Sequence, residues 1–360
     1  QRSVGMFALA LWDRFERVLH LARDRFGEKP LYWGWLQQHG RQVLVFGSEL
    51  SALRALPRAE VPAVDPSALS TYLQIGYLPA PICIYRGLKQ LQPGHLVCIP
   101  SVGDRFSRSW LPDSRPWWDP IAQAAQLPQT ASLDDLHVAL EQAVTEQAIA
   151  DVPLGTFLSG GIDSSLITAM LQFRSSRPVR SFTIAFPDSG AGEDCFNEAP
   201  YARAVAEHLG TDHTEVPLTS ADTQALIPEL PRLYSEPFAD SSQVPTHLVC
   251  REARRGGLTV ALSGDGGDEL FGGYNRHRLI PSLHRRLGDL PTWARRAIAS
   301  SIVKLPVSNR GLDRDKQQKL AAAIRAAGSL EQLQLSLTSV FSHPSILLRP
   351  TWQSVVGSSD

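Results

Sequence analysis

The sequence predicts an α/β protein in two parts: antiparallel strands first, then a parallel sheet covered by helices. In the first ~50 residues, apolar and alternating stretches follow one another without a helical period, which is typical of an antiparallel sheet. From residue 132 onward, strand and helix patterns alternate, which indicates parallel βαβ units. Residues 101–128 have no period and are rich in Pro, Ser and Trp, so we interpret them as a connector. We therefore expect domains at 1–115 and 130–360.

The first part is expected to contain six strands and two helices. A serine opens the first of these helices, which ends before Pro57, and the second runs into a Pro-rich turn. The tryptophans of the connector are expected to pack it onto a domain surface. The expected strands are 5–13, 17–24, 31–35, 42–49, 87–91 and 95–99, and the expected helices are 48–57 and 65–81.

The second part opens with a helix whose start is clearly marked. Ser132 is a candidate N-cap, Asp134 and Asp135 lie in the first turn, and apolar residues follow at helical spacing to residue 150. After it, strands and helices alternate. The strands are expected at 155–160, 179–186, 213–218 and 258–264, and the helices at 163–173, 198–210, 244–257 and from 268.

Composition is that of an ordinary globular protein. The 360 residues are 43% hydrophobic and 20% charged, with a net charge of −1. No basic excess indicates nucleic acid, and no apolar run reaches the length of a membrane span. Four cysteines lie far apart without a C-x-x-C, which fits a reducing cytoplasm better than disulfides or zinc. We expect a cytoplasmic protein that acts on small molecules.

The stretch FLSGGIDSS, Phe157 to Ser165, joins an expected strand to an expected helix. Ligands of parallel sheets bind at such strand ends. Gly160 and Gly161 allow backbone N–H groups to approach an anion, and the helix adds its positive dipole end. Asp163 would repel phosphate unless a cation intervenes, so it is a candidate Mg²⁺ ligand. The alternative is a plain strand–turn–helix joint, but the full pattern favours a pyrophosphate loop that is neither a Walker loop nor a Rossmann fingerprint.

A second stretch, LSGDGGDELFGGY from Leu262 to Tyr274, also follows a strand and opens a helix. Asp265, Asp268 and Glu269 place three carboxylates close together, and a metal or cationic partner would relieve their repulsion. The spacing does not fit a calcium loop, and a solvated acidic turn is the alternative. Since parallel strands end at one edge of a sheet, we expect both loops to face one nucleotide.

Several stretches together resemble glutamine-dependent asparagine synthetases of the bacterial B type. They are FLSGGIDSS, SFTIAF, FNEAPYARAVAEHLGTDHTEV, SEPFADSSQVPTHLV and ALSGDGGDELFGGY, in this order. Upstream, GMFALALWD, ARDRFGEKPLYWG and FGSELSALRALP resemble the later part of that family's class II glutaminase domain. The resemblance covers residues 4–280. It implies a truncated Ntn-type αββα glutaminase domain followed by a PP-loop ATP pyrophosphatase domain of the adenine-nucleotide alpha-hydrolase kind.

The resemblance also implies the chemistry. ATP with Mg²⁺ activates the aspartate side chain as β-aspartyl-AMP, and ammonia from glutamine converts it to asparagine. Asp163 and Asp268 match the magnesium ligands, and Asp265 stands where many members have a catalytic glutamate. Phe157 and Ile184 match positions whose backbone holds adenine. The full implied ATP set is Phe157, Leu158, Ser159, Gly160, Gly161, Asp163, Ser164, Ser165, Ile184, Ser263 and Gly264.

Parts of the family pattern are not found. The family's glutaminase uses a cysteine as first residue, whereas this sequence starts with Gln1 and its first cysteine is Cys83. The family's glutamine-holding residues and its C-terminal synthetase segment have no match either, and the chain opens within an apparent core strand. We expect a chain truncated at both ends, without glutaminase activity and with weak or no synthetase activity. The alternative is a natural short paralogue; release of glutamate from glutamine would contradict the expectation.

Other functions stay open. A relative of the family that amidates or cyclises a different carboxylate, in cell-surface sugar or secondary-metabolite synthesis, would share every motif above. Another ATP pyrophosphatase, such as an NAD or GMP synthetase, and a non-catalytic module are the further alternatives. Asp240 and Ser241 face an acceptor pocket or cap a helix, while His213 and Glu215 serve packing and hydrogen bonding. A homodimer is also possible on this interpretation.

Overall fold

The computed structural model describes residues 3–54, 56, 62–102, 105–106, 113–127, 130–187, 197–304, 314–341 and 347–348. Cys195 and the final stretch 351–360 lie outside them. The chain forms two compact units, each described by itself below. Unit 1 is Gln1–Leu69 with Leu78–Gly264, and unit 2 is Ser70–Tyr77 with Asp265–Asp360. Among the described helices, none is both long and apolar enough to cross a membrane.

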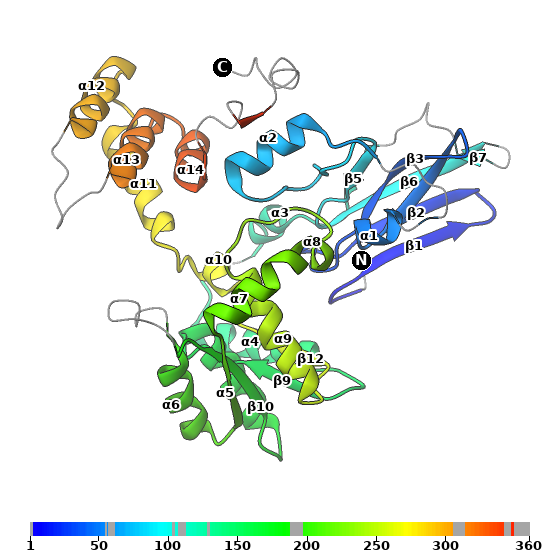
Figure 1. The fold of residues 1–360 in the computed structure, drawn as a ribbon, viewed down its shortest axis with the longest axis vertical. Coiled ribbons are helices and arrows are strands. Elements are labelled where there is room, and N and C mark those ends of the chain that lie inside the picture. The colour runs from blue at the N-terminus through cyan, green and yellow to red at the C-terminus, as the bar shows by residue number, and fades with distance from the viewer. Residues whose placement is uncertain are drawn as a thin grey trace. The chain divides into compact units, whose positions relative to one another are not determined.

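Unit 1 begins with two antiparallel sheets (Figure 1). One has the order β1-β2-β6-β7, with β8 also paired to β6, and the other has the order β4-β3-β5. The strands are β1 (Ala8–Asp13), β2 (Val18–Arg23), β3 (Tyr32–Gln38), β4 (Arg41–Gly47), β5 (Leu88–Gln90) and β6 (His95–Val102). The helices of this part of the chain are α1 (Leu50–Arg54) and α2 (Pro66–Ile75), and α2 belongs to unit 2 from Ser70 onward. All of these expected elements are confirmed, with ends shifted by a few residues.

The two antiparallel sheets share one apolar core. Leu21 and Val97 of the first sheet have no exposed surface, and they belong to one buried cluster with Trp33 of the second. β1 differs, because it lies at the edge of its sheet and, among the described strands, pairs with β2 alone. Its Leu9 and Leu11 are 49% and 55% exposed. The interpretation of β1 as a core strand is therefore wrong for these side chains.

The connector contains more structure than its sequence predicts. It holds β7 (Arg105–Phe106), β8 (Arg115–Pro116) and α3 (Pro120–Ala124). The strands are too short for any period. β7 pairs with the adjacent end of β6, and β8 pairs with its opposite end, at His95 and Leu96. The predicted packing role is confirmed for Trp117, whose indole N–H donates to the Arg23 carbonyl at 3.1 Å and whose ring stacks on Phe7, whereas Trp110 lies outside the described residues.

The rest of unit 1 is the predicted parallel sheet, in the order β11-β10-β9-β12. Its strands are β9 (Leu154–Phe157), β10 (Arg180–Ala185), β11 (Asp212–Pro217) and β12 (Val260–Leu262). Its helices are α4 (Leu133–Gln147), α5 (Ile162–Arg174), α6 (Ala199–Leu209) and α9 (Gln243–Arg255). The sequence did not predict α7 (Ser220–Leu226), the 3₁₀ helix η2 (Ile227–Glu229) and α8 (Leu230–Leu233), which are too short to show a period.

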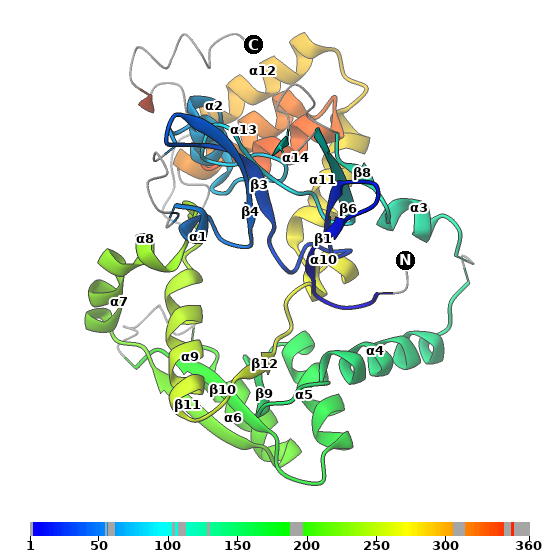
Figure 2. The ribbon, with the colours of Figure 1, turned by 90° about the vertical axis from the view of Figure 1, so that its right-hand side faces the viewer.

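The two faces of the parallel sheet differ in chemistry. One face is apolar, and Phe182 and Val216 pack there against Val249 of α9. The other face carries hydroxyl groups, and Thr156 and Ser181 are completely buried on it. Strand alternation puts these sets on opposite faces, and α6 and α9 lie on opposite sides of β10 (Figure 1). Figure 2 shows α5, α6 and α9 beside the strands of this sheet from a second side.

Unit 2 is helical. It contains α10 (Gly267–Phe271), α11 (Asn275–Leu287), α12 (Thr292–Val303), α13 (Arg314–Ala326) and α14 (Leu330–Thr338). Small residues allow close helix packing: Ala299 of α12 and Ala321 of α13 have no exposed surface and share a cluster with Ile324.

Candidate active site

The loop FLSGGIDSS lies between β9 and α5, as predicted, and the Ser164 hydroxyl organises it. Its oxygen accepts a hydrogen bond from the Ser159 N–H at 3.2 Å and lies 2.9 Å from Ser159 Oγ. It also lies 3.3 Å from the Gly161 carbonyl oxygen. Ser159 Oγ in turn accepts from the Gly161 N–H at 3.2 Å. The two hydroxyl groups therefore hold the loop in a tight turn.

Two glycines keep side chains out of this turn. Gly160 has a φ of +81°, and a Cβ there would lie 2.6 Å from the backbone nitrogen of Ala202 in α6. Gly161 is the N-cap of α5 and makes no side-chain capping bond. The first-turn N–H groups of a helix have no partner within the helix. Without a capping side chain, they are available to bind an anion.

The second predicted loop meets the first at the start of α5. β12 lies beside β9 in parallel, with Leu262 opposite Thr156. Ser263 and Gly264 follow, and a Cβ on Gly264 would lie 2.8 Å from the Ser164 nitrogen and 3.0 Å from the Asp163 Cβ. The backbone of the second loop is thus packed against the first turn of α5.

The groups around this contact suit phosphate and Mg²⁺ carried by a nucleotide. Ser165 Oγ is buried and has no hydrogen-bond partner among the described residues. Asp163 is partly exposed in the first turn of α5. No group of three or more His, Cys, Asp or Glu within the described part of the chain could hold a metal. Magnesium commonly binds through one or two carboxylates plus substrate phosphates, so the residues fit Mg²⁺ bound together with ATP.

The residues expected near adenine would reach it through their backbone. Leu158 is 1% exposed, and Phe157 and Ile184 pack against apolar clusters. The pairing of β9 with β10 ends at Phe157 and Phe182, and the Leu158 N–H donates to the Phe182 carbonyl. Backbone groups two residues apart on a strand point the same way. Ile184 therefore directs its polar backbone groups to the side on which β9 has ended.

The acidic residues of the second loop from Asp265 onward belong to unit 2. Asp265 is exposed, and Asp268 lies in the first turn of α10. Glu269 Oε1 accepts a hydrogen bond from the Tyr274 hydroxyl at 2.7 Å, and this bond lowers the Glu269 pKa. The Arg276 guanidinium lies 3.8 Å from the centre of the Tyr274 ring. A tyrosine that sequence reasoning missed thus stabilises one of the three carboxylates.

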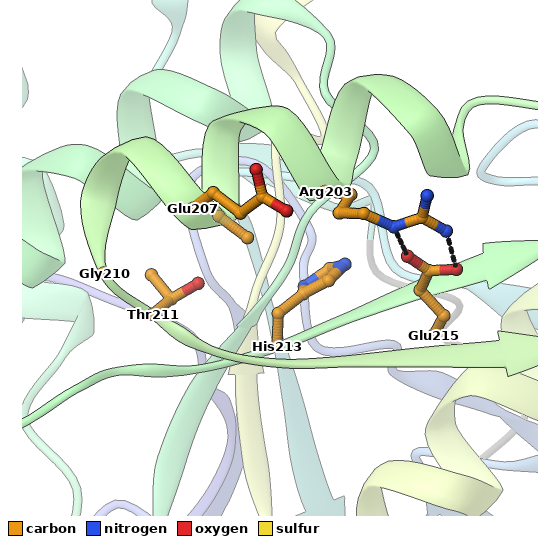
Figure 3. Close-up of a pocket in the computed structure, with 7 residues that line it drawn as sticks. Arg203, Glu207, Gly210, Thr211, His213 and Glu215 are labelled. Atoms are coloured by element: carbon orange, nitrogen blue, oxygen red, sulfur yellow. Dashed lines mark hydrogen bonds and ion pairs between the residues drawn. The ribbon is translucent and has the colours of Figure 1, made fainter.

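A pocket of about 500 Å³ lies elsewhere on the parallel sheet, beside the C-terminal end of α6 (Figure 3). Arg203 donates both to Oε1 and to Oε2 of Glu215, at 2.7 and 2.8 Å. His213 Nδ1 lies 2.8 Å from Ser181 Oγ, and burial lowers the His213 pKa. The packing and hydrogen-bonding role expected for His213 and Glu215 is confirmed. The lining residues are Arg203, Ala206, Glu207, Gly210, Thr211, His213 and Glu215.

The segment EPFADSS leads into α9. Asp240 Oδ1 accepts from the Ser242 N–H at 2.8 Å, a local turn next to the start of the helix. Asp240 and Ser241 are exposed. Glu236, at the start of the segment, bonds to residues 204 and 152 positions away in the sequence. No sequence signal marks these contacts, because they depend on the tertiary fold.

Comparison with known protein families gives two matches, one for each part of the chain described above. The asparagine synthase family matches residues 135–346, which include both loops. The chain belongs to the asparagine synthase family. The glutamine amidotransferase domain family matches residues 1–110, the part with the two antiparallel sheets. The resemblance identified from the motifs is confirmed for both parts.

Individual members of the asparagine synthase family are moderately similar. A Mycobacterium bovis protein provisionally named as a glutamine-hydrolysing asparagine synthetase is 36% identical over 86% of this chain and 46% of its own. Asparagine synthetase [glutamine-hydrolyzing] 1 of Bacillus subtilis is 30% identical over 85% and 45%. Asparagine synthetase B of Escherichia coli is 29% identical over 75% and 43%. The chain spans about half the length of these curated relatives.

Proposed function

We propose that the protein is an asparagine synthetase that uses ATP, Mg²⁺ and ammonia derived from glutamine. The observation that carries the proposal is the packing of Gly264 against the Ser164 nitrogen, which joins the two family loops at the first turn of α5. The first turn of α5 carries N–H groups that have no partner within the helix, serine hydroxyls and the Asp163 carboxylate. Such a set suits the triphosphate of ATP with its cation.

The proposed reaction has two steps. A side-chain carboxylate oxygen of aspartate attacks the α-phosphorus of ATP, and pyrophosphate leaves with the electron pair of the broken P–O bond. Ammonia then attacks the acyl carbon, loses a proton, and AMP leaves with the C–O bond electrons. The products are asparagine, AMP and pyrophosphate. Glutamine hydrolysis supplies the ammonia and releases glutamate.

Each group of residues has a separate proposed role. The N–H groups and hydroxyls of the first loop bind the departing pyrophosphate, where negative charge develops. Bound Mg²⁺ would neutralise phosphate charge, and Asp163 and Asp268 are its proposed ligands. Asp265 is the proposed catalytic acid that helps ammonia attack. The proposed nucleotide contacts are Phe157, Leu158, Ser159, Gly160, Gly161, Asp163, Ser164, Ser165, Ile184, Ser263 and Gly264.

The test is an assay of the whole natural protein with ATP, Mg²⁺, ammonia and aspartate. Equal amounts of asparagine, AMP and pyrophosphate are expected. Asp163→Ala and Asp268→Ala should each abolish AMP formation and leave the folded state intact. The matched control is Asp289→Ala, an acidic residue outside both loops. AMP formation only with another carboxylate would favour the related amidotransferase or cyclase, and no AMP with any carboxylate would contradict the proposal.

Two further features belong to the proposal. A cytoplasmic location gives access to ATP and free amino acids. A homodimer is the proposed assembly, which sedimentation of the natural protein would test.

A further inference from the structure

Glu236 connects the segment before α9 to the antiparallel part of the same compact unit. Its Oε2 accepts a hydrogen bond from the Tyr32 hydroxyl at 2.8 Å. Its Oε1 accepts from the Ile84 N–H, also at 2.8 Å. Tyr32 begins β3, whereas Ile84 lies in the stretch between α2 and β5. One carboxylate therefore holds two separate pieces of the antiparallel part.

The residue before Glu236 makes a contact of the same kind. Ser235 Oγ accepts from the Ser51 N–H at 3.3 Å and donates to Ser51 Oγ at 3.3 Å. Ser51 lies in α1. Two consecutive residues thus bond to three places in the antiparallel part, which fixes both the position and the direction of the chain there.

The groups around Glu236 are neutral donors. Burial, followed by the Glu236 charge, raises the pKa of Tyr32 above its usual range. Burial is also the main cause that raises the pKa of the neighbouring Cys83 to about 12, and the Glu236 charge adds to it. Both side chains are nearly inaccessible, at 7% and 5% exposure. A half-buried carboxylate is costly unless such donors meet it, so this cluster is sensitive to the loss of any member.

A short stretch separates Glu236 from the exposed residues before α9. Pro237 follows directly and restricts the backbone on both sides of it. The Phe238 carbonyl accepts from the Gln243 side-chain amide at 3.1 Å, and the Asp240 turn closes the stretch. Residues 237–242 are thus fixed by Glu236 at one end and by α9 at the other. A shift at Glu236 would move Asp240 and Ser241.

We propose that Glu236 is a positioning residue for binding of the acceptor carboxylate, and that residues 237–242 are the element it positions. The proposal rests on the proposed function, and it adopts the interpretation from the sequence in which Asp240 and Ser241 face the acceptor pocket. Glu236 acts through the chain and touches no substrate. Its partners Tyr32 and Ile84 lie in the region that matches the glutamine amidotransferase domain. The acceptor segment is therefore tied to that region by hydrogen bonds.

The first experiment measures hydrogen exchange in the whole natural protein. Glu236→Ala removes both acceptors, whereas Glu236→Gln keeps one for the Ile84 N–H. The matched control is Glu229→Ala, which removes a carboxylate that pairs with Arg232 at the surface. Exchange at Ile84 and at residues 238–242 is expected to become about ten-fold faster in Glu236→Ala. The exchange rates of Glu236→Gln should lie between those of Glu236→Ala and the wild type. The exchange rates of the Glu229→Ala control should equal those of the wild type.

The second experiment measures the KM for the acceptor carboxylate in an AMP-forming assay. It is expected to rise about ten-fold in Glu236→Ala, with the KM for ATP and kcat nearly unchanged, and to recover partly in Glu236→Gln. Tyr32→Phe keeps the hydrogen bond from the Ile84 N–H to Glu236 and should raise the acceptor KM by less. This variant replaces Glu236→Ala in the assay if the alanine variant does not fold. An unchanged acceptor KM, or unchanged exchange at residues 238–242, overturns the proposal. Absence of AMP formation in the wild type contradicts the proposed function instead, and the exchange result still decides whether Glu236 holds the segment.

Discussion

A methyl group added at Gly264 should weaken both the fold and nucleotide binding. The new Cβ would lie 2.8 Å from the Ser164 nitrogen and 3.0 Å from the Asp163 Cβ. The nitrogen belongs to the backbone and cannot rotate away as a side chain can. Gly264 is not among the glycines with a positive φ, so the cost of Gly264→Ala is steric. Either the end of β12 or the first turn of α5 must move.

The size of the effect follows from this clash. Overpacking of a well-packed region costs about 1–3 kcal/mol, so the free energy of unfolding should fall by about 2 kcal/mol. This corresponds to roughly a 30-fold change in the folding equilibrium. Displacing the Ser164 N–H from a phosphate loses a hydrogen bond to a charged group, about 1.5–3 kcal/mol. The Kd for ATP with Mg²⁺ should therefore rise by about one to two orders of magnitude.

Urea unfolding followed by tryptophan fluorescence, with titration calorimetry of Mg²⁺–ATP, checks both quantities. The matched control for stability is Gly161→Ala in the first loop. Its Cβ would meet Ser159 Oγ at 3.3 Å, a side-chain atom that can move aside. The control should lose less than about 1 kcal/mol. If the free energy of unfolding and the Kd for ATP of Gly264→Ala both equal those of the wild type, the two loops do not meet. The argument for one site then fails.

Three other predictions concern single side chains. Ser164→Ala leaves the Ser159 N–H without its acceptor and should lower the free energy of unfolding by about 1–3 kcal/mol in urea titrations. His213 has a lowered pKa in the folded state because of burial, so stability should rise with pH between that lowered value and its unfolded value of about 6.5. Stability is lost on acidification through this window, and His213→Asn should flatten the dependence in unfolding measured from pH 5 to 8. Tyr274→Phe removes the hydrogen bond to Glu269, so an NMR titration should find the Glu269 pKa raised toward its usual value.

Elements with strong local signals could be predicted from the sequence. The start of α4 is an example: Ser132 and Asp135 form the reciprocal capping box that the pattern indicates. The alternation of strands and helices likewise predicts the parallel sheet. α7 carries the same kind of capping box, at Thr219 and Asp222, but it is too short to show a helical period. β7 and β8 are two residues each and carry no such signal, because strands this short depend on their pairing with β6. The proposed division into domains at 1–115 and 130–360 stays a prediction.

The site could be predicted in kind but not in detail. The sequence indicates a pyrophosphate loop at Gly160 and Gly161, because glycines between a strand and a helix suit an anion. It does not indicate that Ser164 holds this loop, since a hydroxyl at that position could also point to solvent. It also indicated that a metal or cationic partner relieves the repulsion among Asp265, Asp268 and Glu269, and this stays a prediction. Glu269 itself accepts a hydrogen bond from the Tyr274 hydroxyl, which lowers its pKa, and the Arg276 charge adds to this effect. The metal and ATP assignments of individual residues stay predictions.

The register of the parallel sheet determines which residues of the two loops meet. Leu262 lies opposite Thr156, so β12 and β9 end at nearly the same level. The hydroxyls of Thr156 and Thr168 lie 3.2 Å apart, which fixes how α5 is rotated on the sheet. In this orientation the Ser164 nitrogen lies close to the residue after Ser263. Only a residue without a side chain fits at that position, which is Gly264. A shift of one residue would turn every side chain of β12 to the other face and bring Ser263 to this point in place of Gly264. The need for glycine in the second loop therefore follows from the register of β12 and from the close approach of the first turn of α5.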